Sequence, residues 1–414
     1  MSILKINRSR LISEISTLAT FSDAPAPAVT RILYSKQDQA ARVWLREKIL
    51  EAGLTIREDG LGNLFARWEG SELDLPAIGT GSHIDAIPYS GKFDGVVGVL
   101  GGLEAIRALK ESGLSIKRSI ELVMFTAEEP TRFGIGCLGS RAMAGTLVPN
   151  EIVELVDQNG HSLEELRQAA GFTDTLNDVQ LPSDYYQSFI ELHIEQGPRL
   201  EGANLQIGIV TSIAAPATLR AVLKGDGGHA GATLMPGRKD ALVAASAIVQ
   251  DVEKAALESD SPDSVATVGL LQVHPGAVNS IPSKVTMEID IRDTQLTTRD
   301  TMVDRVLEKI SKVCKQRDIG YEIDILNRDD PCQSGPSIIE AAEKVTKDLG
   351  YSYKMLVSRA YHDTLFMAKI CPTAMIFVPS ENGYSHRPEE FTADDDVVRG
   401  VEVLAHTMAK LSNQ

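Results

Sequence analysis

Five residues able to bind a divalent metal lie at or just beyond the ends of apolar runs. They are His83, Asp94, Glu129, His193 and His386. These side chains offer only nitrogen and oxygen ligands, which suit Zn²⁺, Mn²⁺, Co²⁺ or Ni²⁺ without selecting among them. Three imidazoles and two carboxylates are enough to hold a pair of such ions, if one of the carboxylates binds both. The set predicts the two-metal site of a metal-dependent hydrolase.

Another acid directly precedes one of these ligands. Glu128 stands next to Glu129, after a continuous apolar run over 120–126 that is typical of a buried strand. Successive side chains of extended chain point in different directions, so the two carboxylates cannot readily bind the same ion. With one as a ligand, the other can take a proton from water and pass it to a leaving nitrogen. The pair therefore predicts catalysis as well as metal binding.

The composition excludes some classes of partner. The formal net charge is −16 over 414 residues, which argues against a surface for nucleic acid or anionic membrane. No long apolar run follows the N-terminus, so the sequence predicts neither a secretory signal nor a transmembrane helix. The four cysteines are scattered, as expected of reduced thiols. Together these features predict a cytoplasmic protein without a nucleic-acid or membrane partner.

The first half of the chain alternates helix and strand signals. Helical stripes cover 37–52 and 95–109, and apolar strands cover 120–126 and 189–194. This alternation predicts an α/β fold with a mostly parallel sheet covered by helices on both faces. Ligands of such sheets gather at the carboxyl ends of the strands, where the metal-binding residues are expected to meet.

A second pattern interrupts the first between about 214 and 328. Its elements follow the order β-α-β-β-α-β, with a cleanly alternating strand over 284–291 and a helical stripe over 299–313. That order predicts a ferredoxin-like domain inserted into the first one. We therefore expect a catalytic metal-binding domain over 1–213 and 329–414, and an inserted lid or dimerisation domain over 214–328.

Four strings carry a family resemblance. They are residues 81–92 (GSHIDAIPYSGK), 128–135 (EEPTRFGI), 193–198 (HIEQGP) and 358–363 (SRAYHD). They resemble dinuclear amidohydrolases and peptidases related to aminoacylases, within them the N-carbamoyl-amino-acid hydrolase and allantoate amidohydrolase family, including its ureidoglycolate-hydrolysing group. The resemblance covers nearly the whole chain.

The resemblance implies a role for each metal-site residue. His83, Asp94 and His193 would hold one metal. Asp94, Glu129 and His386 would hold the other, so the Asp94 carboxylate would bridge the two ions. Glu128 would be the general acid and base. Asp85 would orient the His83 imidazole through its other ring nitrogen. Among metals the resemblance favours Mn²⁺, two ions per subunit.

The resemblance also implies a substrate pocket. Arg292, at the end of the alternating strand, would fork onto a substrate carboxylate. Asn279 and Gln196 would form hydrogen bonds with the amide atoms of the substrate. Tyr361 and His362 occupy a place where the wider family usually has Gly-His, and the Tyr matches the ureidoglycolate group and would narrow the pocket.

His229 lies in a glycine-rich loop over 225–231. In the family, this histidine reaches the site of the partner subunit and stabilises the oxyanion. The resemblance therefore implies a homodimer, with the inserted domain contributing to both sites.

These expectations combine into one function. The chain would hydrolyse (S)-ureidoglycolate, a small ureido carboxylate, with glyoxylate, CO₂ and ammonia as eventual products. Hydrolysis of allantoate or of an N-carbamoyl-L-amino acid is the alternative with the same chemistry, and a dinuclear aminopeptidase is a further one. A metal-binding scaffold without catalysis is the alternative of another class, and an intact Glu128 beside the ligands argues against it.

Overall fold

The computed structural model describes residues 4–414, which form two compact units. The larger unit runs to Thr211, resumes at Ser334 and continues to Gln414, and the smaller unit comprises Ser212–Gln333. Relative to the predicted domain limits, the smaller unit takes in a few more residues at each end. The reason is an antiparallel pair in which Cys332 and Gln333 (β15) lie beside Ile213 and Ser212.

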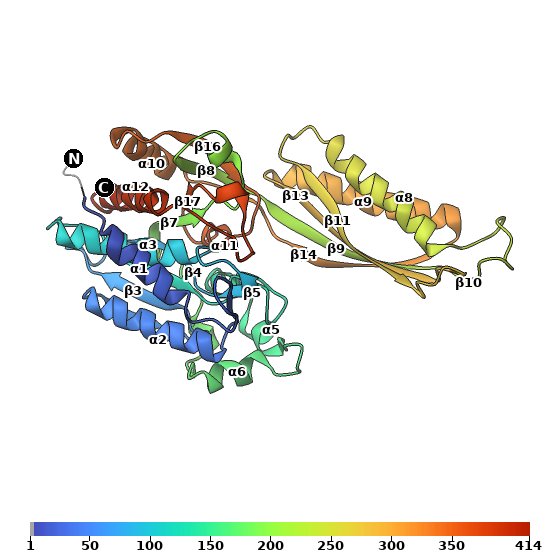
Figure 1. Cartoon of the computed structure of the whole chain (residues 1–414), viewed down its shortest axis with the longest axis horizontal. Helices are drawn as coiled ribbons and strands as arrows, with labels where there is room; N and C mark the ends of the chain where they lie inside the picture. The colour runs from blue at the N-terminus through green and yellow to red at the C-terminus, as the bar shows by residue number, and fades with distance from the viewer. Residues whose placement is uncertain (1–3) are drawn as a thin grey trace. The chain divides into compact units, whose positions relative to one another are not determined.

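A nine-stranded sheet forms the core of the larger unit, although its edge strand β15 and the last two residues of β8 fall within the smaller unit (Figure 1). Its order is β15 (Cys332–Gln333), β8 (Ile207–Ile213), β17 (Thr373–Val378), β7 (Tyr186–Ile194), β4 (Ala77–His83), β6 (Ile120–Phe125), β3 (Leu64–Trp68) and β2 (Thr55–Glu58), and β16 (Tyr353–Ser358) pairs with β8. The central strands β17, β7, β4 and β6 are parallel to one another. On either side, β8 and β3 pair antiparallel with the central strands, and β15 and β2 pair antiparallel with β8 and β3. The predicted mostly parallel central sheet is confirmed.

Helices cover both faces of this sheet, as predicted. One core cluster joins the sheet to α1 (Arg8–Leu18), α2 (Lys36–Glu51), α3 (Val96–Glu111), α10 (Pro336–Asp348) and α12 (Asp394–Ser412). The other joins it to α4 (Leu138–Met143), α5 (Pro149–Glu154), α6 (Leu163–Ala169), α11 (Asp363–Met367) and the short η1 (Leu176–Asp178). Successive side chains of a strand point to opposite faces of the sheet. Leu122 and Val123 of β6 therefore pack into different core clusters.

Short elements complete the larger unit. The strands β1 (Val29–Arg31) and β5 (Ala86–Ser90) form a separate antiparallel pair. The remaining turns of helix are α7 (Arg199–Gly202) and η2 (Glu381–Gly383). Among residues 4–414, no helix is both long and apolar enough to cross a membrane.

The smaller unit has the predicted β-α-β-β-α-β order. Its elements are β9 (Ala215–Lys224), α8 (Ala241–Leu257), β11 (Val265–His274), β13 (Lys284–Asp293), α9 (Leu296–Arg317) and β14 (Gly320–Arg328). The strands form an antiparallel sheet in the order β11-β13-β9-β14. A second, small pair joins β10 (Gly228–His229) to β12 (Ser280–Ile281). Alternate residues of β13 are buried against α8 and α9, so this sheet has one covered face.

Candidate metal centre

The five predicted metal-binding residues meet at one edge of the larger unit's sheet. His83 is the last residue of β4, and His193 is the next-to-last residue of β7. Glu129 follows β6, Asp94 lies just before α3, and His386 lies in the loop that follows β17. The four strands β17, β7, β4 and β6 run parallel to one another, so their carboxyl ends share this edge. The local chain directions thus explain why residues so far apart in sequence come together.

Asp94 stands at the middle of the group. Its Oδ1 lies 3.2 Å from His193 Nε2 and 3.9 Å from His83 Nε2. Its Oδ2 lies 3.0 Å from His386 Nε2, which is also 3.4 Å from Glu129 Oε1. The candidate ligand atoms form two sets, and within each set they lie within 4.8 Å of one another. One set is His83, Asp94 and His193, and the other is Asp94, Glu129 and His386. The shared carboxylate can therefore face two ions at once.

The charges of this edge suit divalent cations. The ion pairs that Asp85, Asp94, Glu128 and Glu129 make with the described residues are all with histidines. The carboxylates of Asp85, Asp94 and Glu129 are buried, and a buried anion without a cationic partner is strongly unfavourable. Two divalent ions on these nitrogen and oxygen donors would remove that cost.

The two imidazoles on the strands, His83 and His193, are each held in one tautomer. His83 Nδ1 lies 3.1 Å from the carbonyl of Asp85, and His193 Nδ1 lies 2.9 Å from the carbonyl of Ile194. A carbonyl only accepts, so each Nδ1 donates and each Nε2 keeps its lone pair for a metal. In agreement, the Gly95 amide donates to His193 Nε2 at 3.2 Å.

Asp85 acts on two neighbours of the centre. Its backbone carbonyl receives the His83 ring proton, while its carboxylate Oδ1 lies 3.5 Å from the same nitrogen. The carboxylate also accepts the backbone amides of Glu128 (3.2 Å) and Glu129 (3.0 Å). Asp85 therefore fixes the segment that carries both acids as well as one imidazole.

The environment of Glu128 favours its protonated form. Burial, followed by the repulsion of the neighbouring Glu129 carboxylate, raises the pKa of Glu128 well above its usual value. Its Oε2 lies 3.8 Å from His83 Nε2, so the carboxylate stands beside a ligand atom. Cys137 donates from Sγ to the other oxygen, Oε1, at 3.4 Å. The side chain is thus held at the centre and can carry a proton there.

Two predicted substrate-binding residues also border the centre. Gln196 donates from Nε2 to Asp94 Oδ2 at 3.0 Å, and its buried Oε1 has no hydrogen-bond partner among the described residues. His362 is buried with its ring 4.7 Å from that of His193, and its Nε2 lies 2.8 Å from Ser358 Oγ. Tyr361 stacks on Phe366 with the ring planes 9° apart.

The three other predicted residues belong to the smaller unit. His229 is exposed in β10, and its Nδ1 accepts the amides of Gly231 and Ala232, each at 3.2 Å. The Asn279 carbonyl accepts the Ala230 amide at 2.8 Å, so Asn279 and His229 are neighbours in this unit. Arg292 pairs with Asp290 through Nε and Nη2, at 2.7 and 3.0 Å.

A buried carboxylate that the sequence analysis did not single out supports the shared ligand. Glu390 Oε1 accepts the backbone amides of Phe93 (2.8 Å) and Asp94 (3.1 Å). Ser385 Oγ lies 3.0 Å from both Asp94 Oδ2 and Glu390 Oε2. Glu390 thus fixes the backbone of Asp94 directly and its side chain through Ser385. The only sequence signal was the nearness of both residues to His386.

Replacing Glu390 by Ala is expected to weaken metal binding about 10- to 100-fold, as loss of an outer-shell partner commonly does. The Asp94 amide would lose its acceptor and the Ser385 hydroxyl one of its two carboxylate neighbours, so the Asp94 carboxylate would be held less firmly. Isothermal titration of the metal-free protein with Mn²⁺ measures the change. Glu389→Ala is the matched control, because Glu389 is exposed and pairs only with Arg387 in the described structure. Equal affinities in the two variants would contradict this role.

Comparison with known proteins agrees with the geometry. Residues 79–410 match the model of peptidase family M20/M25/M40. The ureidoglycolate hydrolase of Oryza sativa subsp. japonica is 51% identical over 414 residues, covering 99% of this chain and 86% of its own. That of Arabidopsis thaliana is 50% identical over 418 residues, covering 99% and 88%.

A solved structure gives the same result. The structure of AtUAH in complex with glyoxylate is 50% identical, with a TM-score of 0.87 and 99% of each chain covered. Both the match over most of the chain and the identity over nearly all of it are decisive for the family. The chain therefore belongs to peptidase family M20/M25/M40.

Proposed function

We propose that this chain is an amidohydrolase that hydrolyses (S)-ureidoglycolate, with glyoxylate, CO₂ and ammonia as eventual products. The observation that carries the proposal is the 51% and 50% identity to two ureidoglycolate hydrolases over 99% of the chain. The same reaction requires a metal centre with an acid beside it, and the described residues offer both. A scaffold without catalysis would have no use for Glu128 in that place.

We further propose a ligand set for two divalent ions. His83, Asp94 and His193 would hold one ion, and Asp94, Glu129 and His386 the other, in keeping with the two sets of converging donor atoms. Bound there, the ions would supply Lewis acidity and lower the pKa of a bound water toward neutrality. Mn²⁺ is the proposed metal, because the family resemblance favours it.

Glu128 is the proposed general acid and base. As the water oxygen attacks the ureido carbonyl carbon, Glu128 takes the water proton. It then gives that proton to the terminal nitrogen as the C–N bond breaks, so that ammonia leaves. A carboxyl group suits both steps when its pKa is raised toward the working pH, which burial achieves for Glu128.

The proposed substrate contacts come from both units. Arg292 would bind the substrate carboxylate as a planar fork, and Asn279 would contact its amide atoms. Gln196 would use its unpartnered Oε1 to accept a substrate N–H. Tyr361 and His362 would also contact the substrate, and Tyr361 would narrow the pocket.

His229 is proposed to stabilise the oxyanion in the site of the partner subunit, which requires a homodimer. Exposed apolar side chains near it support an interface, since Leu234 and Met235 are 78% and 73% exposed and Val278 is fully exposed. A cytoplasmic location is also proposed. It is supported by the four cysteines, none of which forms a disulfide bond within residues 4–414.

The substrate assignment predicts a clear order of turnover. The protein reconstituted with Mn²⁺ should show a kcat/KM for (S)-ureidoglycolate at least about tenfold above that for allantoate or an N-carbamoyl-L-amino acid, because a pocket built for a small substrate discriminates by shape and hydrogen bonding. Ammonia release measures all three, with a dipeptide as a fourth substrate. A preference for allantoate or a carbamoyl amino acid would make the specific assignment wrong. Release of amino acids from the dipeptide would indicate an aminopeptidase.

A further inference from the structure

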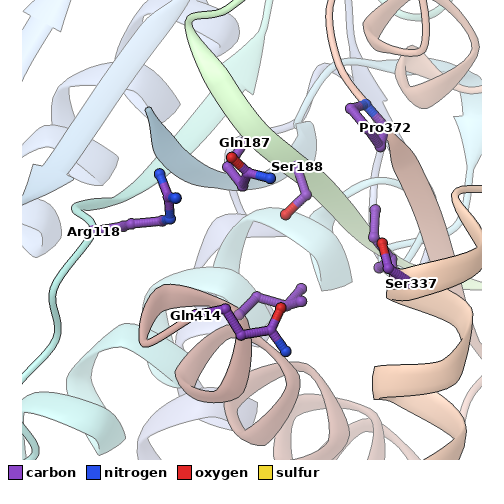
Figure 2. A pocket seen from close by; sticks show the side chains of 8 residues that line it. Arg118, Gln187, Ser188, Ser337, Pro372 and Gln414 are labelled. Atoms are coloured by element: carbon purple, nitrogen blue, oxygen red, sulfur yellow. The ribbon is translucent and has the colours of Figure 1, made fainter. Parts of the chain in front are cut away.

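A cavity of about 140 Å³ with a mixed polar and apolar lining is found in the larger unit (Figure 2). Arg118 lies just before β6, Ser188 lies near the start of β7, and Ser337 lies in the first turn of α10. Gln187 and Gln414 contribute amide groups to the lining. These residues are all in the larger unit, and none is among the residues assigned to the metal centre.

The cavity is separate from the metal centre. Ser188 and His193 lie on the same strand, β7, five residues apart. Strands rise about 3.3 Å per residue, which puts the two roughly 17 Å apart. The parallel strands begin at the cavity and end at the metals, so a ligand in the cavity would not touch the reacting atoms.

Two hydrogen-bond donors at the cavity are buried without a partner. Ser188 is only 3% exposed, and its Oγ has no hydrogen-bond partner among the described residues. Arg118 Nε is also shielded from solvent and without a partner there, while Arg118 Nη1 donates to the Pro76 carbonyl at 3.2 Å. Buried donors of this kind almost always have an acceptor, so both indicate one inside the cavity.

The start of α10 adds a third source of positive potential. This helix of 13 residues begins with Pro336, and the amide of Ser337 has no carbonyl of a preceding turn to bond. Helix N-termini carry partial positive charge and bind anions. Leu411, in the last turn of α12, also lines the cavity. Two backbone carbonyls of this turn already accept hydrogen bonds. Ala409 accepts from Asn413 Nδ2 at 3.1 Å, and Ser412 accepts from the Arg118 amide at 3.0 Å.

We propose that this cavity binds a small oxyanion, phosphate or a carboxylate. Such an ion accepts hydrogen bonds at every oxygen, which matches a guanidinium N–H, a buried hydroxyl and a helix N-terminus. The cavity is large enough, because one water needs only roughly 15 Å³ of the same kind of volume. Lys117 is exposed beside Arg118 but does not line the cavity, so it provides a matched control.

The test compares binding of inorganic phosphate to the Mn²⁺-loaded protein and to the variants Arg118→Gln, Ser188→Ala and Lys117→Gln. Isothermal titration at constant ionic strength measures the affinity, and the phosphate-dependent rise in Tm gives a second readout. We expect wild type and Lys117→Gln to show the same saturable site. Arg118→Gln should weaken it at least about tenfold, since a charge-assisted hydrogen bond is lost. Phosphate bound by the metals contributes equally to all four proteins, so the difference isolates the cavity.

A parallel titration with acetate separates the two sources of oxyanion. Binding of either ion that weakens in Arg118→Gln and Ser188→Ala supports the proposal, and the tighter ion identifies the source. If neither ion shows a site that differs between Arg118→Gln and Lys117→Gln, the proposal is overturned and the cavity holds water. Should Arg118→Gln fail to fold, Ser188→Ala carries the same test, because it removes only one hydroxyl. The proposal does not depend on the substrate of the metal centre.

Discussion

Replacing Glu128 by Gln is expected to lower kcat about 10³-fold while metal content and folding are retained, since general acid–base catalysis commonly contributes 10²- to 10⁴-fold. Gln keeps the size of the side chain and can still accept from Cys137 Sγ at the carboxylate position, but it cannot take a proton. The amide is neutral, as the protonated carboxyl favoured at this position is, so Tm should stay close to that of wild type. Steady-state kinetics, elemental analysis of the metal content and thermal unfolding together measure the effect.

Glu121→Gln is the matched control for this variant. Glu121 is buried on β6, the strand that leads to Glu128, but it accepts from Tyr186 Oη at 2.6 Å rather than facing the metal centre. This control should change Tm and leave kcat near that of wild type. Two outcomes would remove the general-base assignment. One is near-normal turnover of Glu128→Gln, and the other is a loss of turnover that follows a loss of metal, which would make Glu128 a ligand.

The sequence could predict that the five candidate ligands converge, because the signals that place them are local. Each ligand adjoins a strand or helix with a readable period, and parallel strands must bring their carboxyl ends together. The strand β4 was harder to delimit, since the apolar run near it ends at Gly79 and the strand continues to His83. Packing requires small residues there. A Cβ on Gly81 would lie 1.9 Å from the Val123 carbonyl oxygen of the adjacent strand.

The supports of the centre could not be predicted in the same way. Glu390 lies 297 positions from Phe93, whose amide it accepts, and Cys137 reaches Glu128 only because the intervening chain turns back. Neither residue has a periodic or motif signal of its own. Contacts of this kind depend on tertiary packing, which propensity and patterning do not encode. The antiparallel strands that flank the parallel centre were missed for a related reason, because strand direction depends on connections and not on composition.

The buried acids and imidazoles share one consequence for the metal-free protein. Burial, followed by repulsion from Asp94, raises the pKa of both Glu129 and Glu390 to about 7, above an ordinary value of 4.5. A hydrogen bond with Asp94 raises the pKa of His386 to about 9, above an ordinary value of 6.5. Without metal, these three groups therefore bind more protons in the folded protein than in the unfolded chain between about pH 4.5 and 9. Stability must fall as pH rises through this window.

Removal of the metals with a chelator is accordingly expected to abolish turnover and to make Tm depend on pH. The metal-free protein should be most stable near pH 5, where Glu129 and Glu390 are protonated and His386 is charged. Its Tm should fall by at least about 5 °C by pH 9, given that about 1 kcal/mol shifts Tm by a few degrees in a protein of this size. Bound ions keep the ligands deprotonated and paired, so the reloaded protein should show a much flatter profile. Thermal unfolding at intervals of one pH unit measures both forms.

Reloading with single metals completes this experiment. Mn²⁺, Zn²⁺, Co²⁺ and Ni²⁺ should each restore the flat profile, because all accept nitrogen and oxygen donors, whereas turnover should return most fully with Mn²⁺. Asp94→Asn is the matched control variant, since it removes the charge that both ion positions share while it keeps the size of the side chain. That variant should lose metal and turnover, and its Tm should depend less on pH than that of the metal-free wild type, because Asp94 itself raises the pKa of Glu129, Glu390 and His386. If the Tm of the metal-free wild type did not depend on pH, the pKa values of Glu129 and Glu390 would not be raised by burial and repulsion. The electrostatic argument for two bound ions would then be wrong.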